Sequence, residues 1–205
     1  MYKLDHFTEK NTNKIIAFIK ANSFALVTGF GDEYPVATQI PLEIICIADK
    51  LFLTGHIMKK TDHHLAFAKD DKVLVVFSGP HCYVSASWYN NPQSASTWNY
   101  MTVQAKGKII FTDEEGTYKA IQSLTGKYEE TASSAAFNKM PKAYVMPMLK
   151  AIIGFTIEVE SLAATFKLSQ NKQPDEQRNI IHQLRNRGDE QSVKIAGEME
   201  NLIII

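Results

Sequence analysis

The sequence is poor in cysteine and has no excess of either charge and no long apolar run. Only Cys46 and Cys82 occur among 205 residues, so we expect a reducing compartment rather than a disulfide framework. No stretch approaches the ~20 apolar residues that a helix needs to cross a bilayer. Residues 1 to 22 are polar and amphipathic, unlike a secretory signal. These absences predict a cytoplasmic protein that does not enter the membrane.

The charges are balanced, with 22 Lys and Arg against 22 Asp and Glu. A protein that grips nucleic acid through its phosphates usually carries a basic excess. The arginines Arg178, Arg185 and Arg187 near the C-terminus alternate with acidic residues such as Asp175 and Glu176. A solvated helical face explains them at least as well as a recognition helix does, so direct DNA contact is not expected.

Several common catalytic patterns are also missing. Gly29-Phe30-Gly31 lacks the third glycine of a dinucleotide fingerprint and precedes a strand, so a hairpin turn is the expected structure. The six histidines have no metal-binding spacing, and adjacent His63 and His64 would point to different sides of a helix. No Ser or Cys lies in a nucleophile elbow. Neither a metal site nor hydrolysis is indicated.

Hydrophobic periodicity predicts a mainly β protein with flanking helices, of the α+β class. Short apolar runs joined by turns indicate antiparallel strands, and residues 73–79 read as a strand buried on both faces. Residues 83–89 are expected to continue in extended form, and 98–111 alternate as a strand with one wet face. The expected strands are 24–29, 35–43, 44–48, 51–55, 73–79, 83–89, 98–111 and 154–169. Together they predict a β-barrel.

The expected helices flank this barrel. They span residues 9–22, 63–70, 113–128, 144–153 and 174–187, followed by one more after Gly188. Asp113 suits a helix start because a carboxylate complements the positive end of the helix dipole. Pro147 is expected in the first turn of its helix, and Pro174 opens the C-terminal pair. We therefore expect a barrel domain over residues 1–170 and a helical extension over 171–205.

One segment, LTGHIMKKTDHH at residues 53–64, has the composition of a phosphate site. Its polar members are Thr54, His56, Lys59, Lys60 and Thr61, and Asp62 is the expected N-cap of the helix that follows. Ammonium groups and the free amides of a helix N-terminus both favour a dianion. A solvated basic turn would have the same composition, and these residues alone do not separate the two.

Both tryptophans, Trp88 and Trp98, lie within a short span that also holds GPHCYVSASWY. They either fill a core or frame a flat aromatic ligand. With the phosphate segment they suggest a planar ring system that ends in a phosphate, such as flavin mononucleotide (FMN) or pyridoxal phosphate. The latter needs a Schiff-base lysine, and none stands out, so the flavin is the better fit.

The segments PHCYVSASWY, TWNY and KLSQNK, with LTGH upstream, resemble the PaiB-like family of FMN-binding negative transcriptional regulators. The resemblance runs along nearly the whole chain. It implies an antiparallel FMN-binding split β-barrel, related to pyridoxamine-phosphate-oxidase-like proteins, that works as a homodimer. The flavin of such proteins lies in a groove between subunits, and the helical tail packs on the barrel or its dimer partner.

The resemblance also assigns roles to residues. Thr38, Gln39, Ile40 and Pro41 would offer main-chain hydrogen bonds to the edge of the isoalloxazine. The five residues of the 53–64 segment would hold the phosphate, and Trp98 and Asn99 would lie close to the ring. Lys167 and Gln170 would reach the flavin from the other subunit. Trp88 is expected to pack at the subunit interface instead.

The chain departs from the family pattern at three places. Ala86 and Ser96 stand where the family has prolines, and Lys59-Lys60-Thr61-Asp62 replaces an Arg-x-Asn-Pro sequence. Lysine keeps the positive charge but loses the bidentate fork of arginine, so we expect FMN to bind less tightly.

Three functions fit this resemblance. The chain is a flavin-dependent regulator, an FMN-dependent oxidoreductase acting on a small molecule, or a flavin store or sensor without turnover. His56, His81 and Tyr100 are the candidate acids or bases for the second. Side chains of these types at strand ends also commonly satisfy local hydrogen bonds. The sequence leaves turnover open.

Overall fold

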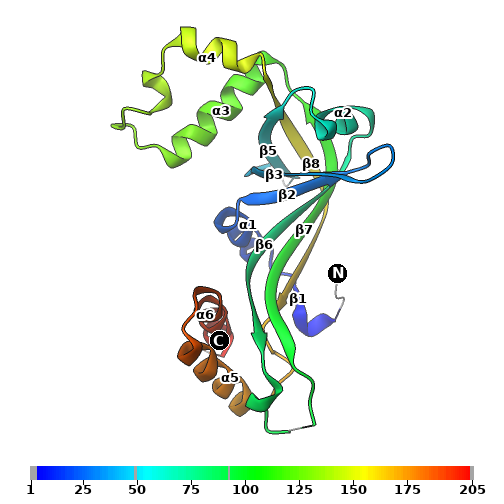
Figure 1. The fold of residues 1–205 in the computed structure, drawn as a ribbon, viewed down its shortest axis with the longest axis vertical. Coiled ribbons are helices and arrows are strands. Elements are labelled where there is room, and N and C mark those ends of the chain that lie inside the picture. The colour runs from blue at the N-terminus through cyan, green and yellow to red at the C-terminus, as the bar shows by residue number, and fades with distance from the viewer. Residues whose placement is uncertain (1–3, 49, 92, 204–205) are drawn as a thin grey trace. The chain divides into compact units, whose positions relative to one another are not determined.

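The structure is a computed structural model that describes residues 4–48, 50–91 and 93–203. It is built around an eight-stranded sheet with the strand order β3-β2-β6-β7-β8-β5-β4, while β1 pairs with β8 (Figure 1). The pairs β2–β3, β2–β6, β4–β5, β5–β8 and β1–β8 are antiparallel. The strands are β1 (Thr8–Glu9), β2 (Phe24–Gly29), β3 (Val36–Pro41), β4 (Glu43–Ile47), β5 (Lys50–Met58), β6 (Lys72–Val84), β7 (Thr97–Phe111) and β8 (Ile152–Lys167).

Six α-helices and three short 3-10 helices accompany these strands in the described residues. The α-helices are α1 (Thr12–Ala21), α2 (Asp62–Lys69), α3 (Glu114–Tyr128), α4 (Lys142–Leu149), α5 (Pro174–Arg187) and α6 (Glu190–Ile203). The 3-10 helices are η1 (Asp5–Phe7), η2 (Ala86–Trp88) and η3 (Phe137–Lys139). The mainly β, antiparallel fold with C-terminal helices is thus confirmed.

The chain forms two compact units, which are described separately. In the described residues, the first unit comprises 4–18, 78–103 and 163–203, and the second comprises 19–77 and 104–162. The strands β6, β7 and β8 contribute residues to both. A domain boundary at residue 170 stays a prediction, and residues 204 and 205 of the expected extension lie outside the described residues.

The second unit contains the curled part of the sheet. The strands β3 and β4 are the two ends of the hydrogen-bonded path, yet only Leu42 separates them in sequence. The sheet must therefore curl until its two ends meet at this buried leucine. The fully buried side chains that fill the interior of this unit include Val27, Leu53, Val75, Phe77 and Ile157.

The curl leaves a split between β3 and β5. The strand β3 contacts both β5 and α2, but its hydrogen-bonded partner is β2. Glycine at position 55 allows this approach, because a Cβ there would lie 2.9 Å from Leu42 Cδ2 and 3.3 Å from the Pro41 carbonyl oxygen. The helix α3 also contacts β5. At the edge of α3, the Thr117 hydroxyl accepts a hydrogen bond from the Gly154 amide at 2.8 Å.

The first unit holds the C-terminal helices, which pack along each other. Both were predicted. The bounds of α5 are confirmed, and α6 begins after Gly188 as expected. Gly188 ends α5 with a φ of 76°, and the Asp189 carboxylate caps α6 by accepting from the Ser192 amide at 2.9 Å. Their shared core consists of Ile180, Leu184, Ile195, Ala196 and Met199, each at most 1% exposed.

Five local expectations were wrong. The helix expected over residues 144–153 spans Lys142–Leu149 instead, and β8 already begins at Ile152. Residues 83–89 do not stay extended: β6 ends at Val84, because the Ser85 hydroxyl accepts from the Ser87 amide and starts η2. Pro147 lies inside α4 rather than in its first turn, since the helix already begins at Lys142.

The other two concern burial and capping. The run 73–79 buries mainly one face, with Val73, Val75 and Phe77 buried and the residues between them more exposed. Thr61, not Asp62, is the N-cap of α2, because the Thr61 hydroxyl accepts from the His64 amide at 3.3 Å.

Candidate functional site

Nine of the thirteen predicted site residues lie in the second unit, around the split between β3 and β5. The strand β3 ends at Pro41, and the chain passes through Leu42 into β4, whose first residue Glu43 pairs with Thr54 of β5. Pro41 and Leu42 therefore lie beside Gly55. The nine are Thr38, Gln39, Ile40 and Pro41 on β3, Thr54 and His56 on β5, and Lys59, Lys60 and Thr61 in the turn that leads into α2. Because α2 contacts β3, these three segments belong to one region.

The strand β3 offers its main chain to this region. In the described part of the chain, β2 is its one hydrogen-bonded neighbour, so its other edge has no strand partner. Thr38 and Ile40 are half-buried, while Gln39 is exposed. Pro41 has no N–H and can offer its carbonyl oxygen alone. An unpaired strand edge suits a flat ligand whose rim carries both donors and acceptors.

Thr54 and His56 share one face of β5, opposite the buried Leu53, Gly55 and Ile57. Both are half-buried. Burial lowers the pKa of His56 because the charged imidazolium loses water. The imidazole is therefore neutral near pH 7 and presents one donor and one acceptor nitrogen.

The turn after β5 is held by its backbone. Lys60 adopts a positive φ of 66°, and its amide donates to His64 Nδ1 at 3.2 Å. The Lys59 amide donates to the Ala151 carbonyl at 2.8 Å. The Thr61 hydroxyl donates to the Met58 carbonyl at 3.0 Å and also serves as the N-cap. Thr61 therefore shapes the turn, whereas the exposed lysines carry its positive charge.

The start of α2 already holds one negative charge. The Asp62 carboxylate accepts from the His63 amide at 2.7 Å and lies 3.1 Å from His63 Nδ1. The hydrogen bond from this amide lowers the pKa of Asp62. An incoming phosphate would meet this carboxylate beside the two lysines.

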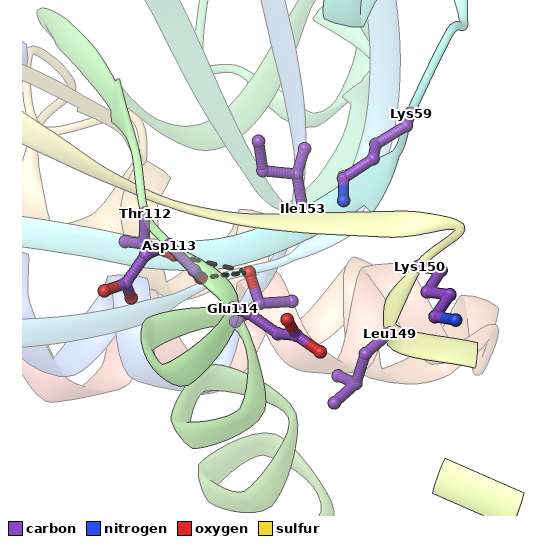
Figure 2. A pocket seen from close by; sticks show the side chains of 8 residues that line it. Lys59, Thr112, Asp113, Glu114, Leu149, Lys150 and Ile153 are labelled. Atoms are coloured by element: carbon purple, nitrogen blue, oxygen red, sulfur yellow. Dashed lines mark hydrogen bonds between the residues drawn. The ribbon is translucent and has the colours of Figure 1, made fainter. Parts of the chain in front are cut away.

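Lys59 also borders a cavity of about 270 Å³ between α3 and α4. Figure 2 shows Asp113 and Glu114 at the start of α3, with Leu149 and Lys150 at the end of α4. Two ammonium groups and two carboxylates line it, so the cavity has no net preference for an anion. Sequence reasoning missed Lys150, which no motif marks.

In the first unit, Trp98 and Asn99 do not share a surface. Trp98 is 53% exposed, and its ring centroid lies 6.2 Å from that of His81 and 6.1 Å from that of Tyr83. Asn99 is fully buried and exchanges hydrogen bonds with the Ser169 hydroxyl at 2.9 and 3.1 Å. Neighbours on a strand point to opposite faces, so one flat ring cannot contact both side chains from one side.

Lys167 and Gln170 have different surroundings. The side-chain amide of Gln170 makes its hydrogen bonds at the end of β8. It accepts from the backbone amide of Leu168 at 2.7 Å and donates to the Phe166 carbonyl at 2.5 Å. Lys167 donates to the Thr97 hydroxyl, and burial lowers its pKa. Gln170 therefore stabilises the turn that follows, while Lys167 borders a cavity.

Trp88 packs within its own chain. The Arg187 guanidinium lies 4.7 Å from the centroid of its indole, and Asn179 donates to its carbonyl at 2.7 Å. Arg185 pairs with Glu200 at 2.6 Å. Two of the three C-terminal arginines thus stabilise the first unit. A place for Trp88 at a subunit interface stays a prediction.

The structure also bears on two broader features. Within the described ranges, no group of three or more His, Cys, Asp or Glu side chains is arranged to hold a metal ion. Over the same residues, none of the helices combines the length and apolar character needed to span a membrane.

Comparison with known proteins identifies the family. Residues 1–161 match the family described as "Putative FMN-binding domain". The chain belongs to this family. It is 32% identical over 202 residues to the protease synthase and sporulation protein PAI 2 of Bacillus subtilis, covering 98% of this chain and 97% of that protein. The predicted PaiB-like resemblance is confirmed.

Two solved structures share the fold. The FAD and heme binding protein from Mycobacterium smegmatis has 14% identity and a TM-score of 0.60, covering 83% of this chain and 78% of that one. The flavocytochrome Anf3 from Azotobacter vinelandii has 12% identity and a TM-score of 0.57, covering 81% and 72%. At these identities the agreement concerns the fold.

The cofactor of this family is FMN, and the donor set around the β3–β5 split fits it. A dianionic phosphate suits the Lys59–Lys60 turn at the start of α2, and the unpaired edge of β3 suits the polar rim of the isoalloxazine. One group opposes the fit, the Asp62 carboxylate.

Proposed function

We propose that this chain is a flavin-dependent regulator that binds FMN in the second unit, with the flavin at the interface of a homodimer. The observation that carries the proposal is the convergence of the free edge of β3, the neutral His56 and the lysine turn on one region. The relative from B. subtilis, whose name refers to protease synthase and sporulation, supports a regulatory role.

Each part of the region has a distinct task. The ammonium groups of Lys59 and Lys60 attract the phosphate, and the main chain of Thr38–Pro41 orients the ring. His56 can donate to or accept from the ring edge without bringing a charge. When bound, FMN supplies one- and two-electron chemistry. Lys167 of a second subunit is our choice for the residue that reaches the flavin across the interface.

Regulation through a small molecule or a protein partner fits this chain better than direct reading of DNA. The formal net charge is zero, and Arg185 and Arg187 are engaged within the first unit. A regulator of this kind would respond to flavin binding or flavin redox state. We place it in the cytoplasm, as the sequence predicts.

An FMN-dependent oxidoreductase acting on a small molecule is the second candidate. The observation in its favour is His56, a half-buried and neutral imidazole that can move a proton near neutral pH. Turnover of FMN with a reductant and a small oxidisable substrate would separate it from a regulator without turnover.

A comparison of FMN with riboflavin tests the site. Riboflavin lacks the phosphate, so the wild-type chain should bind FMN at least tenfold more tightly, which corresponds to about 1.4 kcal/mol. In the double variant Lys59→Met/Lys60→Met, the FMN affinity should fall to that of riboflavin. Quenching of flavin fluorescence measures both affinities.

The matched control is Lys106→Met/Lys108→Met, which removes two exposed lysines of β7. It should leave both affinities unchanged. Equal binding of FMN and riboflavin by the wild-type chain would show that the turn does not hold the phosphate.

A further inference from the structure

A cavity of about 390 Å³ in the first unit is lined by Lys167, while the rest of its lining has no role in the proposed function. It lies between η1, the segment before β7 and the turn after β8. This volume is at the small end of the range of ligand pockets, which is roughly 300–1,000 Å³. Its lining includes two cations, Lys167 and Lys172, several hydroxyls and amides, and no acidic residue.

The two lysines are held in place. Lys167 donates to the Thr97 hydroxyl, and its Nζ lies 5.7 Å from the centroid of the Phe7 ring. The Lys172 Nζ lies 3.6 Å from the centroid of the Tyr89 ring. A cation over an aromatic face loses part of its hydration. Within the described residues, no carboxylate lies within 4.0 Å of the Lys172 ammonium.

The turn that carries Lys172 is rigid. Ser169 adopts a positive φ of 62°, and its carbonyl accepts from the Lys172 amide at 3.0 Å. The Gln170 side chain accepts a hydrogen bond from the Leu168 amide at the end of β8, and the Ser169 hydroxyl donates to the Asn99 side chain. A cavity whose walls are fixed by such bonds is preorganised, so a ligand need not order it.

Tyr89 adds an unsatisfied group to the same wall. It is 8% exposed, and its hydroxyl is buried with no hydrogen-bond partner in the described part of the chain. A buried hydroxyl without a partner is unfavourable, because it has lost its hydrogen bonds to water. An acceptor oxygen that reached it would offset this cost. An oxygen-rich anion supplies such acceptors and balances the two ammonium charges.

We propose that this cavity is a binding site for a small organic anion, one whose carboxylate or phosphate group lies between Lys167 and Lys172. The anion is either the phosphate of a flavin or a separate small organic acid. Both have the same chemistry at the lysines, and the experiment below distinguishes them. The cavity is too small for a polymer, which makes a metabolite-sized ligand the fitting occupant.

Isothermal titration calorimetry with inorganic phosphate and with succinate tests the proposal on the full chain. At least one probe should bind saturably to the wild-type protein. Lys172→Met should weaken this binding about tenfold or more. Ala95→Asp, which leaves both lysines in place but adds a carboxylate to the lining, should weaken it as well. Lys14→Met, an exposed lysine of α1 in the same unit, is the control and should change nothing.

The source of the anion follows from a repeat with FMN-saturated protein. Persistence of probe binding there identifies a separate organic acid as the ligand. Loss of probe binding identifies the flavin phosphate, which would then bind in this cavity and not at the Lys59–Lys60 turn. Lys172→Arg should retain binding, because it keeps the charge.

Two results would overturn the proposal. The first is the absence of saturable binding of either probe. The second is binding that disappears in Lys59→Met/Lys60→Met but survives in Lys172→Met, because the anion would then lie at the turn before α2. Failure of FMN binding alone leaves this proposal standing, so the two sites are tested separately.

Discussion

At the scale of single residues, Asp62 determines how well the chain can hold a flavin phosphate. Sequence reasoning identified it as a departure from the family pattern and expected it to cap α2. The structure gives that task to Thr61 and places the Asp62 carboxylate on the next amide. Two adjacent residues can both cap a helix, and propensity does not decide between them. The charge of Asp62 therefore remains where a phosphate would bind.

Removing this charge should have opposite effects on binding and on stability. Asp62→Asn should tighten FMN binding severalfold, because the exposed carboxylate repels a dianionic phosphate. The same change should slightly lower the free energy of unfolding, since the helix loses a favourable charge at its N-terminus. Flavin fluorescence and urea unfolding measure the two effects.

Asp71→Asn is the matched control, because Asp71 is an exposed carboxylate beyond the other end of α2. It should leave FMN affinity unchanged. Weaker FMN binding in Asp62→Asn would mean that the carboxylate helps to organise the turn more than it repels the phosphate.

His56 makes stability depend on pH. Burial lowers its pKa below the ordinary 6.5, so between these two values the unfolded chain binds a proton that the folded chain does not. Stability is therefore highest above pH 7 and falls as the pH drops through 6.5, by at most about 1.4 kcal/mol per pH unit. The pKa of His64 is lowered too, mainly by burial, and adds to the same trend.

Thermal unfolding between pH 5 and 8 checks this sign. His56→Gln should flatten the profile in that range, leaving the contribution of His64. The substitution His182→Gln, on the exposed face of α5, should leave the profile as it is. A wild-type protein more stable at pH 5.5 than at pH 7.5 would contradict the assignment.

At the scale of elements, the sequence predicted best where a local signal stands at each boundary. Pro174 and Gly188 enclose α5, and Asp113 begins α3, because these residues act through their own backbone or side chain. The prediction from sequence failed at Val84. The apolar run continues beyond this residue, but the strand ends there because the Ser85 hydroxyl caps η2. It failed again at Pro147, whose position depends on a start at Lys142 that no residue type marks.

Alanine substitutions at two glycines test whether such local backbone effects contribute to stability. Gly188→Ala should lower the free energy of unfolding by about 1–2 kcal/mol, because alanine is strained at a φ of 76° although space is free there. Gly126→Ala, on the exposed face of α3 with no atom within 4 Å of a new Cβ, should raise it by up to about 1 kcal/mol. Urea unfolding of both variants is the measurement, and equal effects would contradict the account.

At the scale of the whole molecule, the sequence predicted the class of fold but not how the sheet closes. Only the strand order reveals that β3 and β4 are its two ends, joined through Leu42. The motif order predicted thirteen site residues, yet nine lie in the second unit and four in the first. The alternation of residues 98–111 already placed Trp98 and Asn99 on opposite faces of a strand. The burial of Asn99 could not be predicted, because it depends on Ser169 and Met199, which are distant in the chain.

The central claim is that this chain binds FMN through the second unit as a homodimer. The most direct measurement is an absorbance-detected sizing run of the purified protein after incubation with FMN and removal of free flavin. We predict a perturbed flavin band, with about one FMN per chain, that elutes with protein at twice the chain mass of 23.1 kDa. Protein that elutes without flavin would contradict the claim.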